Sequence, residues 1–156
     1  MKNVITVFIA AALASQLLIA APSDRGKLGI GIVLGAPTGF SLKYWENQRF
    51  AYQGTIGSMF SGGLTIGADA LFHENIFRDS RVPFYYGPGV FIGNAAWGGP
   101  DYSHDGLALG VRAAFGADFI SREYPFDAAL ELGPALLLAP KLGIGVQLSL
   151  SFRYYP

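Results

Sequence analysis

Large apolar residues alternate strictly with small or polar residues over thirteen positions near the C-terminus of the chain. From Leu142 to Tyr154 every even-numbered residue is large and apolar, whereas the odd-numbered residues are glycine, serine, glutamine or arginine. A period of two places these two sets on opposite faces of one β-strand. Strands of soluble domains usually have about 5–6 residues, while a tilted strand needs about 9–11 to cross a bilayer. The pattern and its length therefore predict a membrane-spanning strand.

The same alternation recurs upstream and predicts eight strands in all. In the sixth, Leu107, Leu109 and Val111 alternate with smaller or polar residues. Turn-forming sequences separate the strands, such as Ala-Pro-Thr-Gly at 36–39 and Gly-Gly-Pro-Asp at 98–101. Glycine or proline residues interrupt the third and fifth strands. The predicted strands are 27–35, 38–46, 49–58, 63–74, 82–94, 106–119, 126–138 and 142–155.

The difference in side-chain size between the two faces predicts which face points outward. The interior of an eight-stranded barrel is just large enough to be filled by side chains. The large apolar side chains do not fit there, whereas glycine, alanine, serine and a few charged residues do. This disfavours a soluble lipocalin-like barrel, which needs the opposite arrangement. We therefore expect an all-β fold, an eight-stranded antiparallel up-and-down transmembrane barrel with its apolar face toward lipid.

The N-terminal segment has the features of a secretory signal peptide. Lys2 precedes an apolar run that extends to Ala21, and small residues follow it. We expect residues 1–22 to be the signal peptide, with cleavage at one of residues 20–23, and residues 23–156 to form the barrel domain. An uncleaved membrane anchor is the alternative, because the run is only slightly shorter than a membrane-spanning helix.

Composition narrows the classes of function. Charged residues are 14% of the chain, against roughly 25% in ordinary globular proteins. The formal net charge is zero and there is no cysteine, so nothing favours nucleic-acid binding, a disulfide framework or a thiolate metal site. After Ala21 no segment has the ~18 consecutive apolar residues of a membrane helix. An exported apolar protein of this kind is expected in the outer membrane, with outer-membrane lipid and the barrel-assembly machinery as partners.

An even number of strands places both termini in the periplasm. The predicted outer loops are then 35–38, 59–62, 95–105 and 139–141, and the inner turns are 46–48, 75–81 and 120–125. Aromatic residues gather near the periplasmic strand ends, as in the aromatic belts of membrane proteins. This expected belt contains Tyr44, Phe50, Tyr52, Phe72, Phe84, Tyr86, Phe119, Phe126, Phe152 and Tyr154.

Several segments carry a resemblance to a known family. They are Gly-Ile-Gly-Ile-Val-Leu-Gly-Ala-Pro-Thr-Gly-Phe-Ser-Leu-Lys-Tyr-Trp at 29–45, Tyr-Tyr-Gly-Pro-Gly at 85–89, Leu-Gly-Val-Arg at 109–112, Leu-Glu-Leu-Gly-Pro-Ala at 130–135 and Arg-Tyr-Tyr at 153–155. Through them the chain resembles a family of small, uncharacterised bacterial outer-membrane β-barrels of the eight-stranded OmpA/OmpX type. The resemblance covers nearly the whole chain after the signal peptide. It implies the fold and the localisation, and almost nothing about activity.

Polar residues on the inward face are expected to form two layers. Near mid-barrel lie Lys43, Gln53, Asp69, Arg112, Glu131 and Gln147, and toward the periplasmic end lie His73, Asp118, Asp127 and Arg153. Unpaired charges are costly in a narrow interior of low dielectric constant, so these side chains should pair with one another. We expect a closed, ion-paired lumen with a structural or surface-interaction role. A narrow low-conductance channel is the alternative, because ionisable residues at membrane depth are often functional.

A lipid A-modifying enzyme is the second alternative, and we do not expect catalysis or a cofactor. His104 lies in Tyr-Ser-His-Asp at 102–105 on the longest outer loop. Neighbours in sequence seldom form a catalytic triad, whose members are usually distant in the chain. His73 is expected to face the lumen and pair with an aspartate. On the same loop, Trp97 and Tyr102 are candidate contacts for an unknown surface partner, or else they extend the aromatic belt into the headgroup layer.

Overall fold

The structure is a computed structural model that describes residues 26–59, 63–93, 107–121 and 123–156. The expected signal peptide, the expected surface contacts Trp97 and Tyr102, and His104 lie outside these ranges. Within the described ranges no helix has the length and apolar character needed to cross a membrane.

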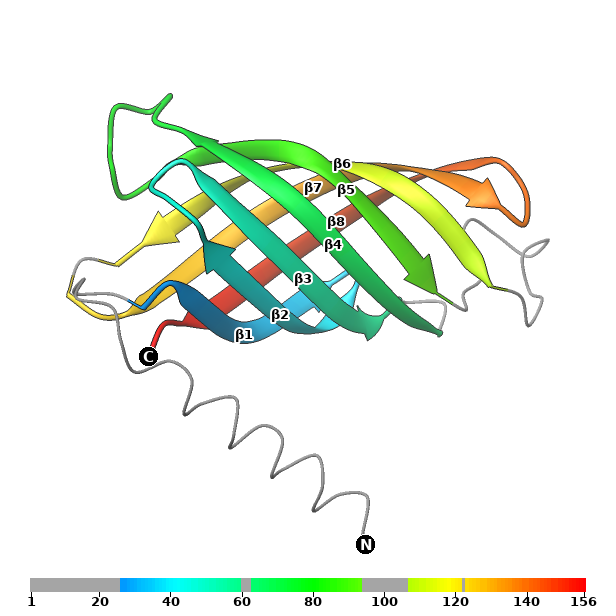
Figure 1. Ribbon diagram of the computed structural model, residues 1–156, viewed down its shortest axis with the longest axis horizontal. Coiled ribbons are helices and arrows are strands. Elements are labelled where there is room, and N and C mark those ends of the chain that lie inside the picture. The colour runs from blue at the N-terminus through cyan, green and yellow to red at the C-terminus, as the bar shows by residue number, and fades with distance from the viewer. Residues whose placement is uncertain (1–25, 60–62, 94–106, 122) are drawn as a thin grey trace, which may run out of the picture.

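Eight antiparallel strands close into a barrel in the described part of the chain. Each strand pairs with its neighbours in sequence, and β1 pairs with β8 to close the sheet. The strands are Leu28–Gly35 (β1), Thr38–Trp45 (β2), Phe50–Ser58 (β3), Leu64–Glu74 (β4), Phe84–Gly93 (β5), Ala108–Ile120 (β6), Phe126–Ala139 (β7) and Gly143–Tyr154 (β8). They run obliquely around the barrel (Figure 1). The predicted all-β, closed antiparallel barrel is confirmed, and no strand end differs from its predicted position by more than two residues.

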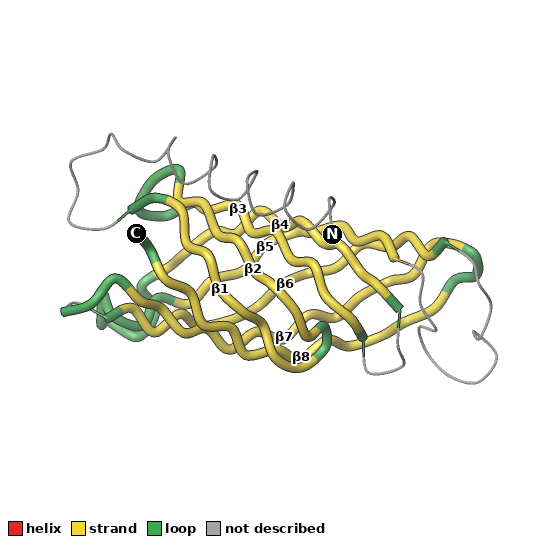
Figure 2. Tube along the Cα trace, turned by 90° about the horizontal axis from the view of Figure 1, so that it is seen from below, coloured by secondary structure: helices red, strands yellow, loops and turns green. Residues whose placement is uncertain are grey.

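The connections lie at the two ends of the barrel (Figure 2). We call the end where β1 begins and β8 ends the terminal end; the β2–β3, β4–β5 and β6–β7 connections lie there too. The opposite end is the loop end. Strands β1, β3, β5 and β7 end there, and strands β2, β4, β6 and β8 begin there.

Two prolines inside strands interrupt the hydrogen-bonded ladder on one side only. β5 remains paired with β6 through Pro88, whereas its pairing with β4 is interrupted between Asp69–Gly89 and Phe72–Tyr86. Proline has no amide hydrogen to donate, so one ladder loses a bond while the other remains intact. Pro134 in β7 has the same effect, because it pairs with β8 but falls in a gap of the β6–β7 ladder. Both prolines therefore lie within continuous strands.

Large apolar side chains cover the outer surface of the barrel. The exposed set includes Ile32 on β1, Leu42 on β2, Ile66 on β4, Leu132 on β7 and Leu148 on β8. The alternating positions of the same strands are mostly buried, with glycine, alanine, serine and charged residues among them. The barrel is thus apolar outside and largely polar inside, the reverse of an ordinary soluble domain.

Not every large side chain points outward. Tyr85, Phe91 and Tyr155 are buried in the interior, where the sequence pattern predicted small and polar residues. Each of them covers an inward-facing glycine. A Cβ atom would lie 2.4 Å from Tyr85 Cζ at Gly116, 2.2 Å from Phe91 Cζ at Gly110, and 2.4 Å from Tyr155 Cζ at Gly29. Because glycine has no side chain, each of these positions leaves a space that an aromatic ring fills.

A belt of aromatic rings surrounds the outer surface near the terminal end. Phe50 contacts Tyr52 and Phe72, with 4.9 Å between ring centroids in both pairs. Phe72 continues to Tyr86 at 6.1 Å, and on the other side of the barrel Phe126 contacts Tyr154 at 5.1 Å. These contacts join residues that the sequence analysis assigned to one belt.

Candidate functional site

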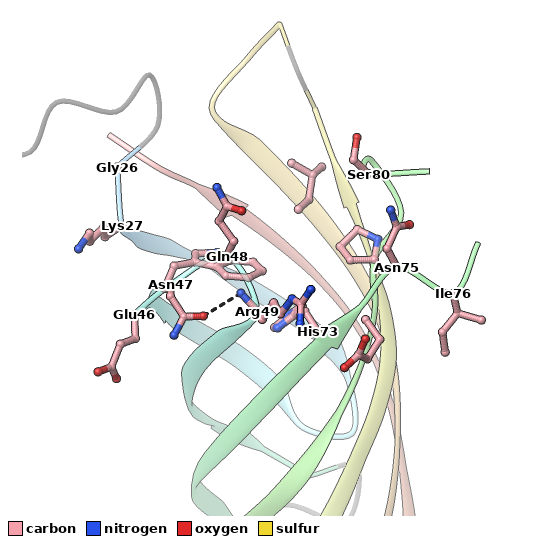
Figure 3. Close-up of a pocket in the computed structure, with 14 residues that line it drawn as sticks. Gly26, Lys27, Glu46, Asn47, Gln48, Arg49, His73, Asn75, Ile76 and Ser80 are labelled. Atoms are coloured by element: carbon pink, nitrogen blue, oxygen red, sulfur yellow. Dashed lines mark hydrogen bonds between the residues drawn. The ribbon is translucent and has the colours of Figure 1, made fainter. Parts of the chain in front are cut away.

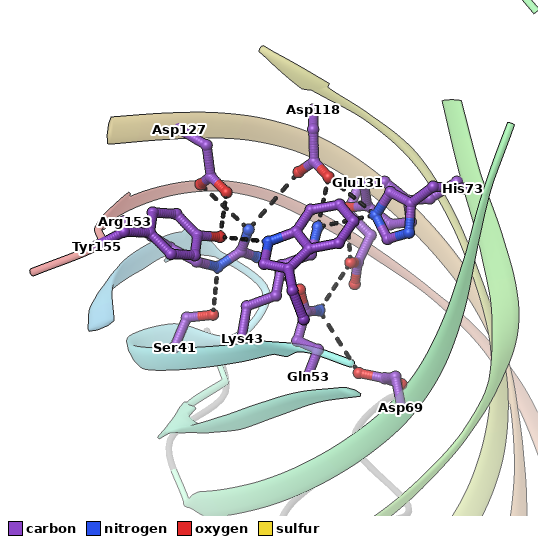
Figure 4. Close-up of polar contacts among 12 residues, drawn as sticks. Ser41, Lys43, Gln53, Asp69, His73, Asp118, Asp127, Glu131, Arg153 and Tyr155 are labelled. Carbon is purple, nitrogen blue, oxygen red and sulfur yellow. Dashed lines mark hydrogen bonds and ion pairs between the residues drawn. The ribbon is translucent and has the colours of Figure 1, made fainter. Parts of the chain in front are cut away.

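Polar side chains from seven strands meet inside the barrel and form two connected clusters, of which Figure 4 shows a part. The first is the Arg112 cluster, which consists of Gln53, Asp69, Tyr85, Arg112, Glu131 and Gln147. Arg112 Nε donates to Asp69 Oδ1 at 2.7 Å, and Nη2 donates to Asp69 Oδ2. The same Nη2 lies 3.3 Å from Glu131 Oε1, and Nη1 donates to Gln147 Oε1. One guanidinium thus holds two carboxylates, using the planar fork geometry that suits a bidentate pair.

Neutral donors supply the remaining hydrogen bonds of the Arg112 cluster. Glu131 Oε2 accepts from Gln53 Nε2 at 2.8 Å and from the Tyr85 hydroxyl at 2.9 Å. The side chains of Asp69, Arg112 and Glu131 are all at least 94% buried. Two carboxylates beside a single arginine leave an excess negative charge, and these donors stabilise it in the buried interior.

The second cluster is the Lys43 cluster, which consists of Lys43, Trp45, His73 and Asp118 near the terminal end. Lys43 Nζ donates to Asp118 Oδ2 and lies 3.0 Å from His73 Nε2. His73 Nε2 is also 3.0 Å from Asp118 Oδ2, and its ring centroid lies 4.3 Å from that of Trp45. Lys43 Nζ is 4.6 Å from the Trp45 ring centroid, within cation–π range. The ammonium group is therefore held by a carboxylate and an aromatic face together.

Arg153 links the two clusters. Its Nη2 donates to Gln53 Oε1 at 2.5 Å, and its Nη1 lies 3.7 Å from Asp118 Oδ1. It also donates from Nε to Ser41 Oγ at 3.0 Å and from Nη1 to Asp127 Oδ1 at 3.4 Å. The interior side chains consequently form one continuous network across the barrel.

Tyr155, one residue beyond β8, completes the network at the terminal end. Its hydroxyl donates to Asp127 Oδ2 and accepts from Trp45 Nε1 at 3.2 Å. Burial and the charge of Asp127 raise the pKa of the Tyr155 phenol, so the hydroxyl keeps the proton that it donates. The C-terminal residues therefore anchor the end of β8 to the interior as well as to β1.

One side chain is grouped differently from the expectation. Lys43 was expected at mid-barrel with Asp69 and Glu131, but its partners are His73 and Asp118 in the layer nearer the terminal end. The backbone of Lys43 does pair with Gln53 at mid-barrel height. Its flexible four-carbon side chain, however, reaches a different layer. The other nine expected interior residues are all buried.

Four side chains of the network were not predicted to lie inside the barrel: Ser41, Trp45, Tyr85 and Tyr155. The two tyrosines stand in Tyr-Tyr pairs at 85–86 and 154–155. In a strand with a period of two, adjacent residues point to opposite faces. That rule places one tyrosine of each pair inside, and it was the available signal for Tyr85 and Tyr155.

The interior beside the Arg112 cluster is densely filled. The cavity there has a volume of about 10 Å³ and is lined by both arginines, by Glu131 and Gln53 and by neighbouring small residues. A single water molecule needs about 10–15 Å³. Toward the loop end, Phe91 and Leu137 pack with Ala108, Ala135 and Met59 into an apolar layer. Side chains therefore fill this part of the barrel.

A large cavity opens at the terminal end, and Figure 3 shows the side chains around it. This terminal cavity has a volume of about 950 Å³. It is lined by Gly26, Lys27, Trp45, Glu46, Asn47, Gln48, Arg49, His73, Glu74, Asn75, Ile76, Ser80, Pro83 and Ile120. Since Trp45 and His73 belong also to the Lys43 cluster, that cluster forms the floor of the cavity.

Two buried polar atoms of the floor, His73 Nδ1 and Asp118 Oδ1, have no hydrogen-bond partner among the described residues, although Asp118 Oδ1 lies 3.7 Å from Arg153 Nη1. His73 is only 4% exposed and its Nε2 contacts Lys43 and Asp118, but its Nδ1 contacts no donor or acceptor there. Unpaired buried polar groups are rare in folded proteins and call for an explanation. Within the described ranges no group of three or more histidine, cysteine or acidic residues has the geometry to hold a metal ion.

Comparison of the chain with models of protein families, with curated proteins and with solved structures finds no match. The eight-stranded antiparallel barrel agrees with the fold that the family resemblance implied. Membership of that family stays a prediction. The function is therefore inferred from the geometry of the barrel itself.

Proposed function

We propose that the chain is an integral outer-membrane β-barrel with a closed, ion-paired lumen and a structural or surface-interaction role. The observation that carries this proposal is the inversion of polarity, with large apolar side chains all around the outside and paired charges inside. Exposure to water costs roughly 25 cal/mol for each Å² of apolar surface. In a bilayer the same surface is matched by lipid, and a closed sheet leaves no backbone edge unpaired.

The lengths of the strands and the aromatic belt support a membrane-spanning orientation. β6, β7 and β8 have 13, 14 and 12 residues, and a tilted strand needs about 9–11 to cross the hydrocarbon layer. Aromatic rings at one end of the outer surface are typical of the boundary between lipid and water. In this orientation the belt and both termini lie on the periplasmic side, and outer-membrane lipid surrounds the barrel.

The filled interior favours a structural or surface-interaction role over transport. An ion that crossed the lumen would have to separate Arg112 from Asp69 and Arg153 from Asp127, because the residual cavity there is only about 10 Å³. Separating buried partners leaves uncompensated charges and is costly. The β5–β6 connection, with the expected contacts Trp97 and Tyr102, is the longest segment at the loop end. It is the proposed contact region for a surface partner.

A gel-mobility experiment tests the membrane location. We expect the protein to fractionate with the outer membrane and to migrate faster when it is not boiled, because a closed barrel of this kind stays compact in detergent. The measurement compares boiled and unboiled samples after separation of the inner and outer membranes. Recovery from the soluble periplasm, or the same mobility in both samples, would contradict the proposal.

Single-channel recording tests the closed lumen. We expect the refolded protein to give no discrete current steps in a planar bilayer, because the ion pairs fill the interior. Steps that change with Lys43→Met or Glu131→Gln but not with Arg81→Met would overturn the closed lumen and support the narrow channel. Arg81 is the appropriate control because it is an exposed cation in the β4–β5 connection.

A further inference from the structure

We propose that the terminal cavity is a binding site for a saccharide of about one or two sugar rings. The volume of about 950 Å³ lies at the upper end of the range of roughly 300–1,000 Å³ found for small-molecule sites. The cavity is open at the terminal end of the barrel and closed at the floor by the Lys43 cluster. A ligand can therefore enter the barrel end and stay there without passing through. The inference concerns the cavity alone and does not depend on the membrane location.

The charges of the lining disfavour strongly ionic ligands. Lys27 and Arg49 contribute two positive charges, and Glu46 and Glu74 contribute two negative charges. A cavity whose lining charges cancel has no net attraction for a nucleotide, an inorganic phosphate or a polyamine. The balance favours a ligand that is neutral or carries both signs of charge.

The other lining residues match a compound that is rich in hydroxyl groups. Asn47, Gln48 and Asn75 carry amides, each of which both donates and accepts hydrogen bonds. Apolar surface from Trp45 and Pro83 lies in the same cavity, together with Ile76 and Ile120. A sugar ring has C–H groups on its faces and hydroxyl groups on its rim, so it meets both kinds of surface at once. In Figure 3, His73 lies between the side with Gln48 and Arg49 and the side with Asn75 and Ser80.

His73 lies at the floor of the cavity, and its buried Nδ1 has no partner among the described residues. Two neighbours occupy Nε2, so Nδ1 is a donor or an acceptor according to the tautomer. A hydroxyl group can satisfy either tautomer, because it both donates and accepts. A ligand carboxylate could satisfy only one. The buried histidine thus favours a ligand rich in hydroxyl groups, as the amide side chains at the rim of the cavity do.

Tryptophan fluorescence of the full-length folded chain in detergent tests the site. The chain has two tryptophans, so Trp97→Phe leaves Trp45, in the cavity wall, as the single reporter. N,N′-diacetylchitobiose and maltose are the two probes, added up to about 0.1 M, far above the ~1 mM dissociation constant of a weak site. We expect at least one probe to change the Trp45 emission with a saturable dependence on its concentration. If N,N′-diacetylchitobiose alone binds, the ligand class is an amino-sugar glycan. If maltose alone binds, the ligand class is a simple glucan. No saturable change with either sugar overturns the proposal.

Variants of the lining distinguish binding in the cavity from binding elsewhere. We expect Arg49→Ala and Asn75→Ala each to weaken binding about threefold to tenfold, the effect of losing one hydrogen bond. The control Arg81→Ala, which removes an arginine at the same end of the barrel but outside the cavity, should leave the affinity unchanged. His73→Gln should weaken binding further. If that variant fails the gel-mobility test for folding, the two rim variants decide the outcome. Equal affinity in both rim variants and the control overturns the proposed site.

Discussion

The variant Arg112→Met is expected to lower the free energy of unfolding of the barrel by about 3–5 kcal/mol, the usual effect of removing one partner of a buried ion pair. Arg112 holds Asp69 through two hydrogen bonds and also faces Glu131. Methionine fills much of the same space but leaves both carboxylates without their cation. The midpoint and slope of urea unfolding in lipid or detergent, followed by the gel-mobility shift, measure the loss.

A matched arginine–aspartate pair on the surface provides the control. Arg81 Nη2 lies 2.7 Å from Asp79 Oδ2, and the Arg81 side chain is 62% exposed. Pairs of this kind contribute about 0–1 kcal/mol, so Arg81→Met should hardly change the unfolding midpoint. Adding Asp69→Asn to Arg112→Met should recover part of the stability, since one uncompensated charge is removed. Equal effects of the two arginine variants would contradict a charge-paired interior.

The variant Gly116→Val is expected to cost about 3 kcal/mol or more, or to prevent closure of the barrel, because overpacking a filled interior forces the backbone to move. A Cβ atom at Gly116 would lie 2.4 Å from Tyr85 Cζ and 2.6 Å from the carbonyl oxygen of Leu130. The second contact is with backbone, so rotation of the tyrosine cannot relieve it. The yield of the faster-migrating form in the gel-mobility assay measures this effect.

Gly54 is the matched control for Gly116. It also lies within a strand, but a Cβ atom there would have no heavy atom within 4 Å. Gly54→Val should fold as the parent chain does, and β-branched residues are favoured in strands. If both variants fold equally well, the close packing of Tyr85 on Gly116 is not required for the barrel.

The period of two predicted the strands because it follows from backbone geometry alone. In β8 the alternation is uninterrupted from Leu142 to Tyr154, and the strand ends differ from the prediction by one residue. β5 was a weak prediction because Pro88 interrupts it. Pairing with β6 on its other side keeps that segment in the sheet. A proline weakens the hydrogen-bonded ladder on one side of its strand. Whether the ladder on the other side is enough to keep the strand in the sheet depends on the neighbouring strand.

The faces of the strands were predictable, but the partners of the side chains were not. Alternation placed Lys43, Asp118 and Arg153 inside, where they are. It contains no information about how far a lysine extends along the barrel axis, so the contact of Lys43 with Asp118 was missed. Tyr85 was missed for a related reason. Whether a large residue fits inside depends on the glycine that faces it on the next strand, and Gly116 lies 31 positions away in the sequence.

The local properties of this protein follow from its amino-acid sequence alone. Strand positions, the apolar outer face and the set of interior charges all follow from the alternation of residues along single strands. The contacts between side chains of different strands depend instead on how the strands are arranged in the closed barrel. Arg112 meets Asp69 across 43 positions and Arg153 meets Gln53 across 100. The terminal cavity forms where the β2–β3 and β4–β5 connections come together with the residues just before β1 and the end of β6. Closure of the sheet brings these residues together, and a periodic pattern along one strand does not encode which strands will face each other.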